Sequence, residues 1–450
     1  MNHKFFPHTD EDLQAMLDKC GEKSLDGFYK DVPADLVFNR DYDLPDAMSE
    51  VEIRRYFNEL AEFNQPLTCF AGAGCYDHYT PSVVNDIVRR SEFLTSYTPY
   101  QAEISQGTLQ YIFEYQSMMT ELTGMEVSNA SMYDGPTATA EAMMMAVANA
   151  KKRNRVLLSQ TVNPNVARVV ETYAKFHGVV IDYIKEEDGV TSKADFEAKI
   201  AEDDVAGVIV ASPNFYGIVE DYTGWADTCH DHKALLVMNC IASTLGVLKT
   251  PAQWGADIAV GDGQSLGIPM NFGGPNVGFL CTSKKLIRKM PGRIVGATVD
   301  ADGKRTFVLT LQAREQHIRR EKATSNICSN QSLMALFVTV YLSLMGKQGL
   351  HEVNEQGYSG AHYLAQRLSE NPHFQLAYPD KPFLNEFVVK TDLDVYALQQ
   401  WCVDDGIQAG LQLDDNRIMF CVTEMRSKNE IDALVESIED YVSTLDKEEE

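Results

Sequence analysis

Sequence patterns typical of strands and of helices alternate strictly between residues 155 and 240 of this 450-residue chain. Short apolar runs rich in β-branched residues predict strands, and the segments between them have apolar residues at helical spacing. The predicted strands are 156–158, 179–184, 205–211 and 235–240, and the predicted helices are 165–176, 193–201 and 224–231. Because parallel strands need crossover connections, this order predicts an α/β fold with a mostly parallel sheet covered on both faces.

The whole chain divides into three predicted parts, and the middle part contains this alternating core. They are a helical N-terminal region (1–100), a large α/β domain (101–349) and a small α+β C-terminal domain (350–450). Capping boxes mark one helix in each flanking part, Ser49 with Glu52 and Ser427 with Glu430. Two further helices are predicted, from Gly107 to Thr123 and from Pro136 onward.

Charge and composition exclude several classes of partner and site. The chain has 39 basic and 65 acidic residues, a net charge of −26, which argues against nucleic acid or an anionic membrane as a partner. No apolar run approaches the roughly 18–20 residues needed to span a bilayer and no signal pattern opens the chain, so a cytoplasmic location is expected. The nine cysteines form no CxxC pair and are expected to be reduced.

The densest group of potential metal ligands is Cys229, His230 and His232. No second ligand pair with suitable spacing follows it. A solvated helix end therefore explains the group better than zinc does, and no metal site is expected.

No lysine occurs between Lys249 and Lys284. This stretch contains a short strand (257–260), a polar turn, a glycine-rich loop and a second strand (277–281). In enzymes that use pyridoxal phosphate, such a turn commonly carries the lysine that holds the cofactor as a Schiff base. Here the turn offers Gln264 and Ser265, which cannot form that bond.

The loop Asp134-Gly135-Pro136-Thr137 starts a helix, where free N–H groups and the helix dipole stabilise an anion. Taken alone, the pattern fits a helix start capped by Asp134 or Thr137 better than it fits a phosphate site. The glycines of residues 70–74 lack the third glycine and the βαβ context of a dinucleotide fingerprint, so they predict a turn.

Five long blocks bring a known family into view. They are FLTSYTPYQAEISQGTLQYIFEYQ (93–116), NASMYDGPTATAEA (129–142), SPNFYGIVED (212–221), GADIAVGDGQSLGIPMNFGGP (255–275) and REKATSNICSNQ (320–331). Together they closely resemble glycine decarboxylase of the glycine cleavage system, in particular the alpha chain of its two-chain form. The resemblance covers almost the whole sequence in the same order, and it implies a fold-type I pyridoxal-phosphate transferase-like fold.

The resemblance also accounts for the missing lysine. In the two-chain enzyme the beta subunit carries pyridoxal phosphate, and its Schiff-base lysine corresponds here to Gln264 or, with a slip of one residue, Ser265. Catalytic members hold the pyridine nitrogen with an aspartate where this chain has Asn239. Asp134, Gly135 and Thr137 would form a remnant of the phosphate loop. The resemblance thus implies that this chain binds no cofactor covalently and is inactive alone.

The resemblance further implies a reaction and partners. The complete enzyme decarboxylates glycine and passes the aminomethyl group to the lipoyl arm of the H protein, as a heterotetramer of two alpha and two beta chains. Since fold-type I sites form at subunit interfaces, Tyr97, Tyr100, Gln101 and Glu103 are candidates for reaching the partner's active site.

Three alternatives stay open at this point. Tyr97 and Tyr100 could simply pack between helices. The chain could be a purely structural or regulatory subunit that contributes no residue to chemistry. It could also be an independent pyridoxal-phosphate enzyme with a lysine from elsewhere, such as Lys249 or Lys284.

Overall fold

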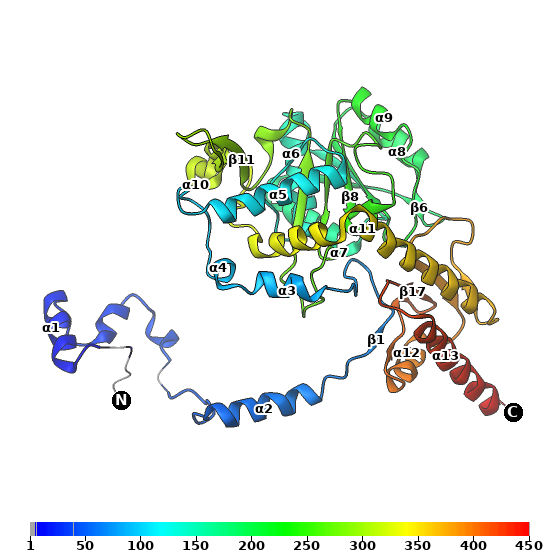
Figure 1. Ribbon diagram of the computed structural model, residues 1–450, viewed down its shortest axis with the longest axis horizontal. Coiled ribbons are helices and arrows are strands. Elements are labelled where there is room, and N and C mark those ends of the chain that lie inside the picture. Colours follow the sequence, from blue (N-terminus) through cyan, green and yellow to red (C-terminus); the bar gives the residue numbers. More distant parts are fainter. Residues whose placement is uncertain (1–4, 6, 39, 450) are drawn as a thin grey trace. The chain divides into compact units, whose positions relative to one another are not determined.

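The computed structural model describes residues 5, 7–38 and 40–449. The chain forms two compact units, Met1–Gln65 and Pro66–Glu450 (Figure 1). The larger unit contains the central sheet, a second smaller sheet and the helices that cover them.

The first unit consists of short helices with little core of its own. Its elements are α1 (Asp10–Cys20), η1 (Leu25–Tyr29), η2 (Ala34–Leu36) and α2 (Glu50–Glu62). The predicted capping box of α2 is present, since the Ser49 N–H donates to Glu52 at 2.7 Å and the Glu52 N–H donates back to Ser49 Oγ at 3.4 Å. None of the residues of α2 is buried. Its apolar side chains are 40–65% exposed, namely Val51, Ile53, Tyr56, Phe57 and Leu60.

A seven-stranded sheet forms the centre of the second unit. Its order is β2 (Val127–Ser128), β10 (Gly278–Thr282), β9 (Ile258–Asp262), β8 (Leu235–Ile241), β7 (Val205–Ser212), β3 (Arg155–Ser159) and β4 (Val180–Ile184). The five strands from β9 to β4 run parallel, whereas β10 is antiparallel to both of its neighbours. The predicted fold class, α/β with a mostly parallel sheet, is confirmed.

Helices cover both faces of this sheet because the side chains of its strands alternate. On β7, Val208 and Val210 join a core formed with α5 and α11, while Ile209 and Ala211 join the core formed with α6 and α7. Every residue of β7 is buried, as expected for a central parallel strand. The covering helices are α5 (Gln106–Thr123), α6 (Gly135–Ala150), α7 (Pro164–His177), α8 (Lys193–Ile200), α9 (Trp225–Asp231) and α11 (Ser332–Ser369).

A four-stranded antiparallel sheet lies in the C-terminal part. Its order is β13 (Phe374–Leu376), β14 (Glu386–Thr391), β17 (Arg417–Cys421) and β16 (Leu411–Asp414), and α12 (Val395–Asp404) and α13 (Lys428–Glu449) complete this part. The short strand β1 (Thr68–Cys69) pairs in parallel with β15 (Ile407–Gln408), and Phe70 is fully buried in the same core. The segment after residue 66 is therefore attached to the C-terminal part.

The helix α11 connects the two sheets and was not predicted from the sequence. It begins well before the predicted boundary at residues 349/350, and its backbone is kinked at Gly346 (φ 59°, ψ −169°). The two predicted domain boundaries, at 100/101 and 349/350, stay predictions. The segment before α11 also contains a hairpin, β11 (Ile294–Val299) with β12 (Arg305–Thr310), that the sequence patterns did not predict.

By length and composition α11 could cross a membrane, although the sequence predicted no such run. Its apolar residues pack within the protein, against α5 at one end and α13 at the other. Buried members include Leu336, Val338, Tyr341, Leu364 and Leu368. Core packing therefore accounts for part of the apolar length of this helix, since 39% of its most apolar stretch is buried.

The remaining elements are short. They are α3 (Ser82–Val88), α4 (Ser91–Leu94), β5 (Glu186–Glu187), β6 (Val190–Thr191), η3 (Ala242–Gly246), η4 (Ile287–Lys289), η5 (Gln312–Arg314), α10 (Gln316–Arg319) and η6 (Arg320–Lys322). The hairpin β11–β12, α10 and the start of α5 lie at the same end of this unit (Figure 1).

Candidate functional site

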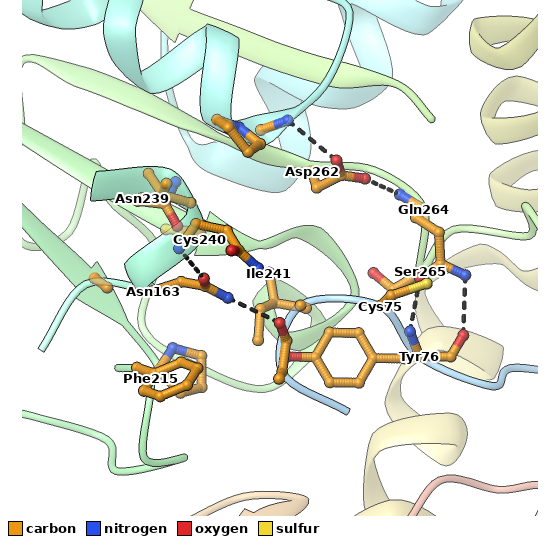
Figure 2. Close-up of a pocket in the computed structure, with 18 of the residues that line it drawn as sticks. Cys75, Tyr76, Asn163, Phe215, Asn239, Cys240, Ile241, Asp262, Gln264 and Ser265 are labelled. Atoms are coloured by element: carbon orange, nitrogen blue, oxygen red, sulfur yellow. Dashed lines mark hydrogen bonds between the residues drawn. The ribbon is translucent and has the colours of Figure 1, made fainter. Parts of the chain in front are cut away.

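A cavity of about 260 Å³ opens at the carboxyl ends of the parallel strands (Figure 2). The ends of β7, β8 and β9 form its floor, and the starts of α6 and α7 form one wall. Residues 73–76, from the segment before α3, close it on another side. Ligand sites of open α/β sheets form at this edge, because the loops after the strands leave a crevice there.

Gln264 anchors the segment that closes the cavity (Figure 2). Its side chain accepts a hydrogen bond from the Tyr76 N–H at 2.9 Å and donates to the Tyr76 carbonyl at 2.9 Å. It also donates to the Ile268 carbonyl at 2.8 Å, and the residue is 2% exposed. An amide fits this role because it can donate and accept at once, as a neighbouring β-strand would.

Ser265 and Asn239, the two other residues predicted to stand at degenerate cofactor positions, are also hydrogen-bonded within the protein. Ser265 Oγ accepts a hydrogen bond from the Ser243 N–H at 3.2 Å. Asn239, at the end of β8, donates from Nδ2 to the Thr139 hydroxyl on α6 at 2.8 Å. Both residues line the cavity, so the structure brings Asn239, Gln264 and Ser265 together in one lining.

Two carboxylates occupy the start of α6. Asp134 caps the helix by accepting from the Thr137 N–H at 2.8 Å. Asp262 accepts from the Gly135 N–H at 3.0 Å and from the Gln264 N–H at 2.8 Å. A Cβ at position 135 would lie 2.7 Å from the Asp262 backbone nitrogen, so only glycine permits this approach. The donors that a bound anion would use are thus already satisfied.

Burial raises the pKa of Asp262 to about 7, although its two backbone hydrogen bonds favour the charged form. The same cause acts on Glu386, whose pKa burial raises to about 7. Glu386 accepts from the Ala73 N–H at 2.7 Å and from the Tyr76 hydroxyl at 2.7 Å. The closing segment is therefore held by Glu386 on β14 as well as by Gln264.

The side chains of the cavity lining that can carry a charge at neutral pH are all acidic. It contains the carboxylates of Asp134, Asp262 and Glu386, several amides, and no lysine, arginine or histidine among the described residues. Lys249 lies outside it, with its ammonium 3.6 Å from the Trp254 ring centroid, and Lys284 lies near Glu126 at 4.0 Å. A dianionic phosphate would meet like charge here without a compensating cation.

The residues predicted to reach a partner lie elsewhere on this unit. Tyr97 and Tyr100 are 78% and 56% exposed, and Gln101 and Glu103 are exposed as well. None of the four lines the cavity. The Tyr100 hydroxyl accepts from Arg293 at 3.2 Å.

The candidate metal ligands point to different neighbours. Cys229 is buried, His230 pairs with Asp257 at 2.9 Å, and His232 pairs with Asp203 at 2.8 Å. Within the described part of the chain, no three such side chains converge on one point.

Sequence reasoning missed three residues of the site, Tyr76, Asp262 and Glu386. Asp262 carried a usable signal, because a polar residue at the end of a buried parallel strand lies at the ligand edge of such a sheet. Tyr76 and Glu386 are 310 residues apart, and no local pattern joins them.

A sequence model of the family described as the glycine cleavage system P-protein matches residues 3–438. The chain belongs to this family. The probable glycine dehydrogenase (decarboxylating) subunit 1 of Moorella thermoacetica is 48% identical over 437 residues, which are 96% of this chain and 98% of that protein. The protein of the same description from Listeria monocytogenes serotype 4b is 47% identical over 448 residues, 97% of this chain and 99% of that protein.

Solved structures agree with this assignment. A crystal structure of glycine decarboxylase (P-protein) in inhibitor-bound form is 40% identical with a TM-score of 0.87, over 98% of this chain and 100% of that chain. Glutamate decarboxylase of Lactobacillus brevis shares the fold at 13% identity, with a TM-score of 0.69 over 92% of this chain and 97% of that chain. The predicted fold type, that of fold-type I pyridoxal-phosphate enzymes, is confirmed.

We expect Gln264→Leu to destabilise the protein by roughly 2–4 kcal/mol, because both polar backbone groups of Tyr76 lose a buried partner. Urea unfolding measures the change. Gln356→Leu, at an exposed position of α11, is the matched control and should change the free energy of unfolding by less than about 0.5 kcal/mol. Equal values for the two variants would show that the amide does not anchor this segment.

Stability should fall as pH rises through neutrality. Because the pKa of Glu386 is raised to about 7 in the folded state, its contribution is complete below the unfolded pKa of about 4.5 and is lost as pH rises through about 7. Glu386→Gln keeps both hydrogen bonds, since its amide accepts from Ala73 and donates to Tyr76.

Between about pH 5 and pH 8, the wild type should lose about 2–3 kcal/mol more of its free energy of unfolding than Glu386→Gln does. Asp262 and Glu141, with pKa values also raised to about 7 by burial, will leave a residual slope in the variant. Glu355→Gln, at an exposed site on α11, should keep the wild-type slope. Identical slopes for all three proteins would contradict the assignment to Glu386.

Proposed function

We propose that this chain is the subunit of glycine decarboxylase that does not carry pyridoxal phosphate, and that it acts together with a cofactor-bearing beta subunit. Its relatives are described as subunit 1 of glycine dehydrogenase (decarboxylating), a description that implies a second subunit. The assembled enzyme decarboxylates glycine and transfers the aminomethyl group to the lipoyl arm of the H protein.

The observation that carries this proposal is that the Gln264 side chain is fully hydrogen-bonded to the backbone. At the position aligned with the Schiff-base lysine there is an amide, and each of its polar atoms is bonded to the backbone of Tyr76 or Ile268. A Schiff base needs a primary amine, and no lysine lines the cavity. Lys249 and Lys284, the two alternatives considered from the sequence, are exposed and point to other partners.

Two further features of the cavity do not fit the cofactor. Asn239 is neutral and donates to Thr139, so it offers no carboxylate to a pyridinium nitrogen. At the other end, Asp134 and Asp262 take the N–H groups that a phosphate would require. No step of the reaction is therefore assigned to this cavity, and the decarboxylation belongs to the beta subunit.

The exposed apolar surface of the first unit favours the presence of an obligate partner. The apolar side chains of α2 are exposed within it, as are Leu36, Leu44 and Phe63, at 70%, 73% and 84%. Obligate interfaces bury on the order of 2,000 Å² or more and are rich in apolar surface. We assign this surface to assembly with the beta subunit, as two alpha and two beta chains in the cytoplasm. The net charge of −26 is unfavourable for nucleic acid or an anionic membrane as an alternative partner.

Incubation of the full-length chain with pyridoxal phosphate and borohydride should leave no adduct on a residue of the cavity. With the beta subunit present, the adduct should appear on a lysine of that subunit, and carboxyl-labelled glycine should release labelled CO₂ in the presence of lipoylated H protein. Peptide mapping by mass spectrometry locates the adduct. An adduct inside this chain's cavity, or glycine decarboxylation without the beta subunit, would overturn the proposal.

Substitutions in the segment Tyr97–Glu103 test whether this chain contributes side chains to the partner's active site or is purely structural. If it contributes side chains to the partner's active site, Tyr97→Phe or Tyr100→Phe should lower kcat for glycine about tenfold or more, with assembly unchanged. If the chain is purely structural, alanine substitutions of Tyr97, Tyr100, Gln101 and Glu103 should each leave turnover of the assembled enzyme unchanged. Size-exclusion chromatography of each variant with the beta subunit checks assembly separately.

A further inference from the structure

Arg293 is a buried arginine without an acidic partner. It lies directly before β11, is 3% exposed, and forms no ion pair with a carboxylate of the described residues. Its Nη2 donates to the Tyr100 hydroxyl at 3.2 Å and lies 3.9 Å from Cys328 Sγ. Its Nε and Nη1 are buried without any hydrogen-bond partner. A guanidinium is rarely buried in this way, because removing a charge from water is costly unless an opposite charge compensates it.

Other unsatisfied polar atoms gather at the same turn. In the described residues, seven buried side-chain nitrogen or oxygen atoms lack a partner, and four of them belong to Asn129, Arg293 and Arg314. The side chains of Asn129 and Arg314 bond to the backbone of residues 290–292, directly before Arg293. Asn129 donates to the Pro291 carbonyl at 3.1 Å, and Arg314 donates to the Met290 and Gly292 carbonyls, the latter at 2.7 Å.

Buried polar atoms are nearly always paired, so such a concentration calls for a physical explanation. It is explained if this part of the chain binds a group that the chain itself does not provide.

Arg314, which contacts this turn, begins a segment that is basic, in contrast to the protein as a whole. Residues 314–322 contain four basic and two acidic residues, within a chain of net charge −26. One of the acids, Glu315, is buried and pairs with His317 at 3.6 Å. The group best suited to this environment is therefore an anion.

Arg293 also contacts two of the five blocks that resemble the P-protein family. Tyr100 belongs to the block 93–116, and Cys328 belongs to the block 320–331. The Tyr100 ring lies over the guanidinium, 5.4 Å from it, and is 56% exposed. The half-exposed Tyr100 side chain therefore lies between Arg293 and solvent, within the segment 97–103 that is a candidate for reaching the partner.

We propose that Arg293 binds an oxyanionic group held in the partner subunit's pocket, and that Tyr100 covers the guanidinium until that group arrives. The inference rests on the proposed function. A guanidinium presents paired N–H donors that match a carboxylate or a phosphate, and it needs no proton transfer to bind either. The anion replaces the weak contact with Cys328 and satisfies the donors left without a partner.

The oxyanion has two possible sources, the carboxylate of glycine and the phosphate of the partner's cofactor. Arg293→Gln and Arg293→Lys are compared with the wild type in the assembled two-subunit enzyme, and Arg288→Gln, at an exposed site, is the control. If the carboxylate is bound, KM for glycine should rise about tenfold or more in Arg293→Gln, while the dissociation constant of pyridoxal phosphate stays unchanged. If the phosphate is bound, that dissociation constant, measured by absorbance on the apoenzyme, should rise instead.

A second readout is independent of turnover. Inorganic phosphate should raise the Tm of the wild-type apoenzyme more than that of Arg293→Gln if phosphate is the ligand, and acetate should do so if a carboxylate is. Arg293→Lys keeps the charge without the paired donors, so its values should lie between those of Arg293→Gln and the wild type. Arg288→Gln should behave as the wild type throughout.

If the Arg293 variants have the same KM, cofactor affinity and Tm shift as the wild type, the inference is overturned. The proposed function would remain intact. Loss of assembly in both variants would also overturn it, because the arginine would then be purely structural. Failure of the wild-type pair of subunits to decarboxylate glycine would instead remove the proposed function on which the inference rests.

Discussion

The pairing of the Gln264 amide with the backbone of Tyr76 determines the character of the cavity. It joins the turn after β9 to the segment before α3 through two hydrogen bonds that run in opposite directions, as in a sheet. Glu386 holds the same segment from β14, through Ala73 and Tyr76. Residues from three distant parts of the sequence are thereby fixed at the carboxyl edge of the central sheet. A cationic amine at position 264 could not make the paired bonds, because it has no acceptor.

Three polar side chains at the ends of β8 and β9 have structural roles in this chain. Asn239 bonds to Thr139 on α6, Asp262 bonds to the Gly135 N–H at the start of the same helix, and Gln264 holds the closing segment. These bonds connect the ends of β8 and β9 to the surrounding loops. The fold thus keeps the crevice typical of its class, while the groups around it are bonded to each other and carry negative charge. This combination is expected of a subunit that retains the fold for assembly.

Local patterns predicted the elements of this fold well, and long-range contacts were the part they missed. The parallel strands and the caps at Ser49, Asp134 and Ser427 follow from patterns a few residues long, because burial and capping act locally. Asn239 and Gln264 were singled out by comparison with pyridoxal-phosphate enzymes and the family that the chain resembles. The hairpin β11–β12 was missed although the turn at 300–303 contains aspartates and a glycine, a usual hairpin signal. The bond between Tyr76 and Glu386 spans 310 residues, and no periodicity reports such a contact.

Two features of the chain lack the contacts that would normally stabilise them, and we relate both to association with the partner. The helix α2 exposes an apolar face that water solvates poorly, and the turn at residues 290–293 contains a buried guanidinium without a counter-charge. Apolar contact supplies affinity but little directional selectivity, whereas a buried charge distinguishes strongly between a matching anion and any other group. We therefore expect the first unit to provide adhesion to the partner. The surface around Arg293 and Tyr100 would then make that association depend on whether the partner's pocket holds an oxyanionic group.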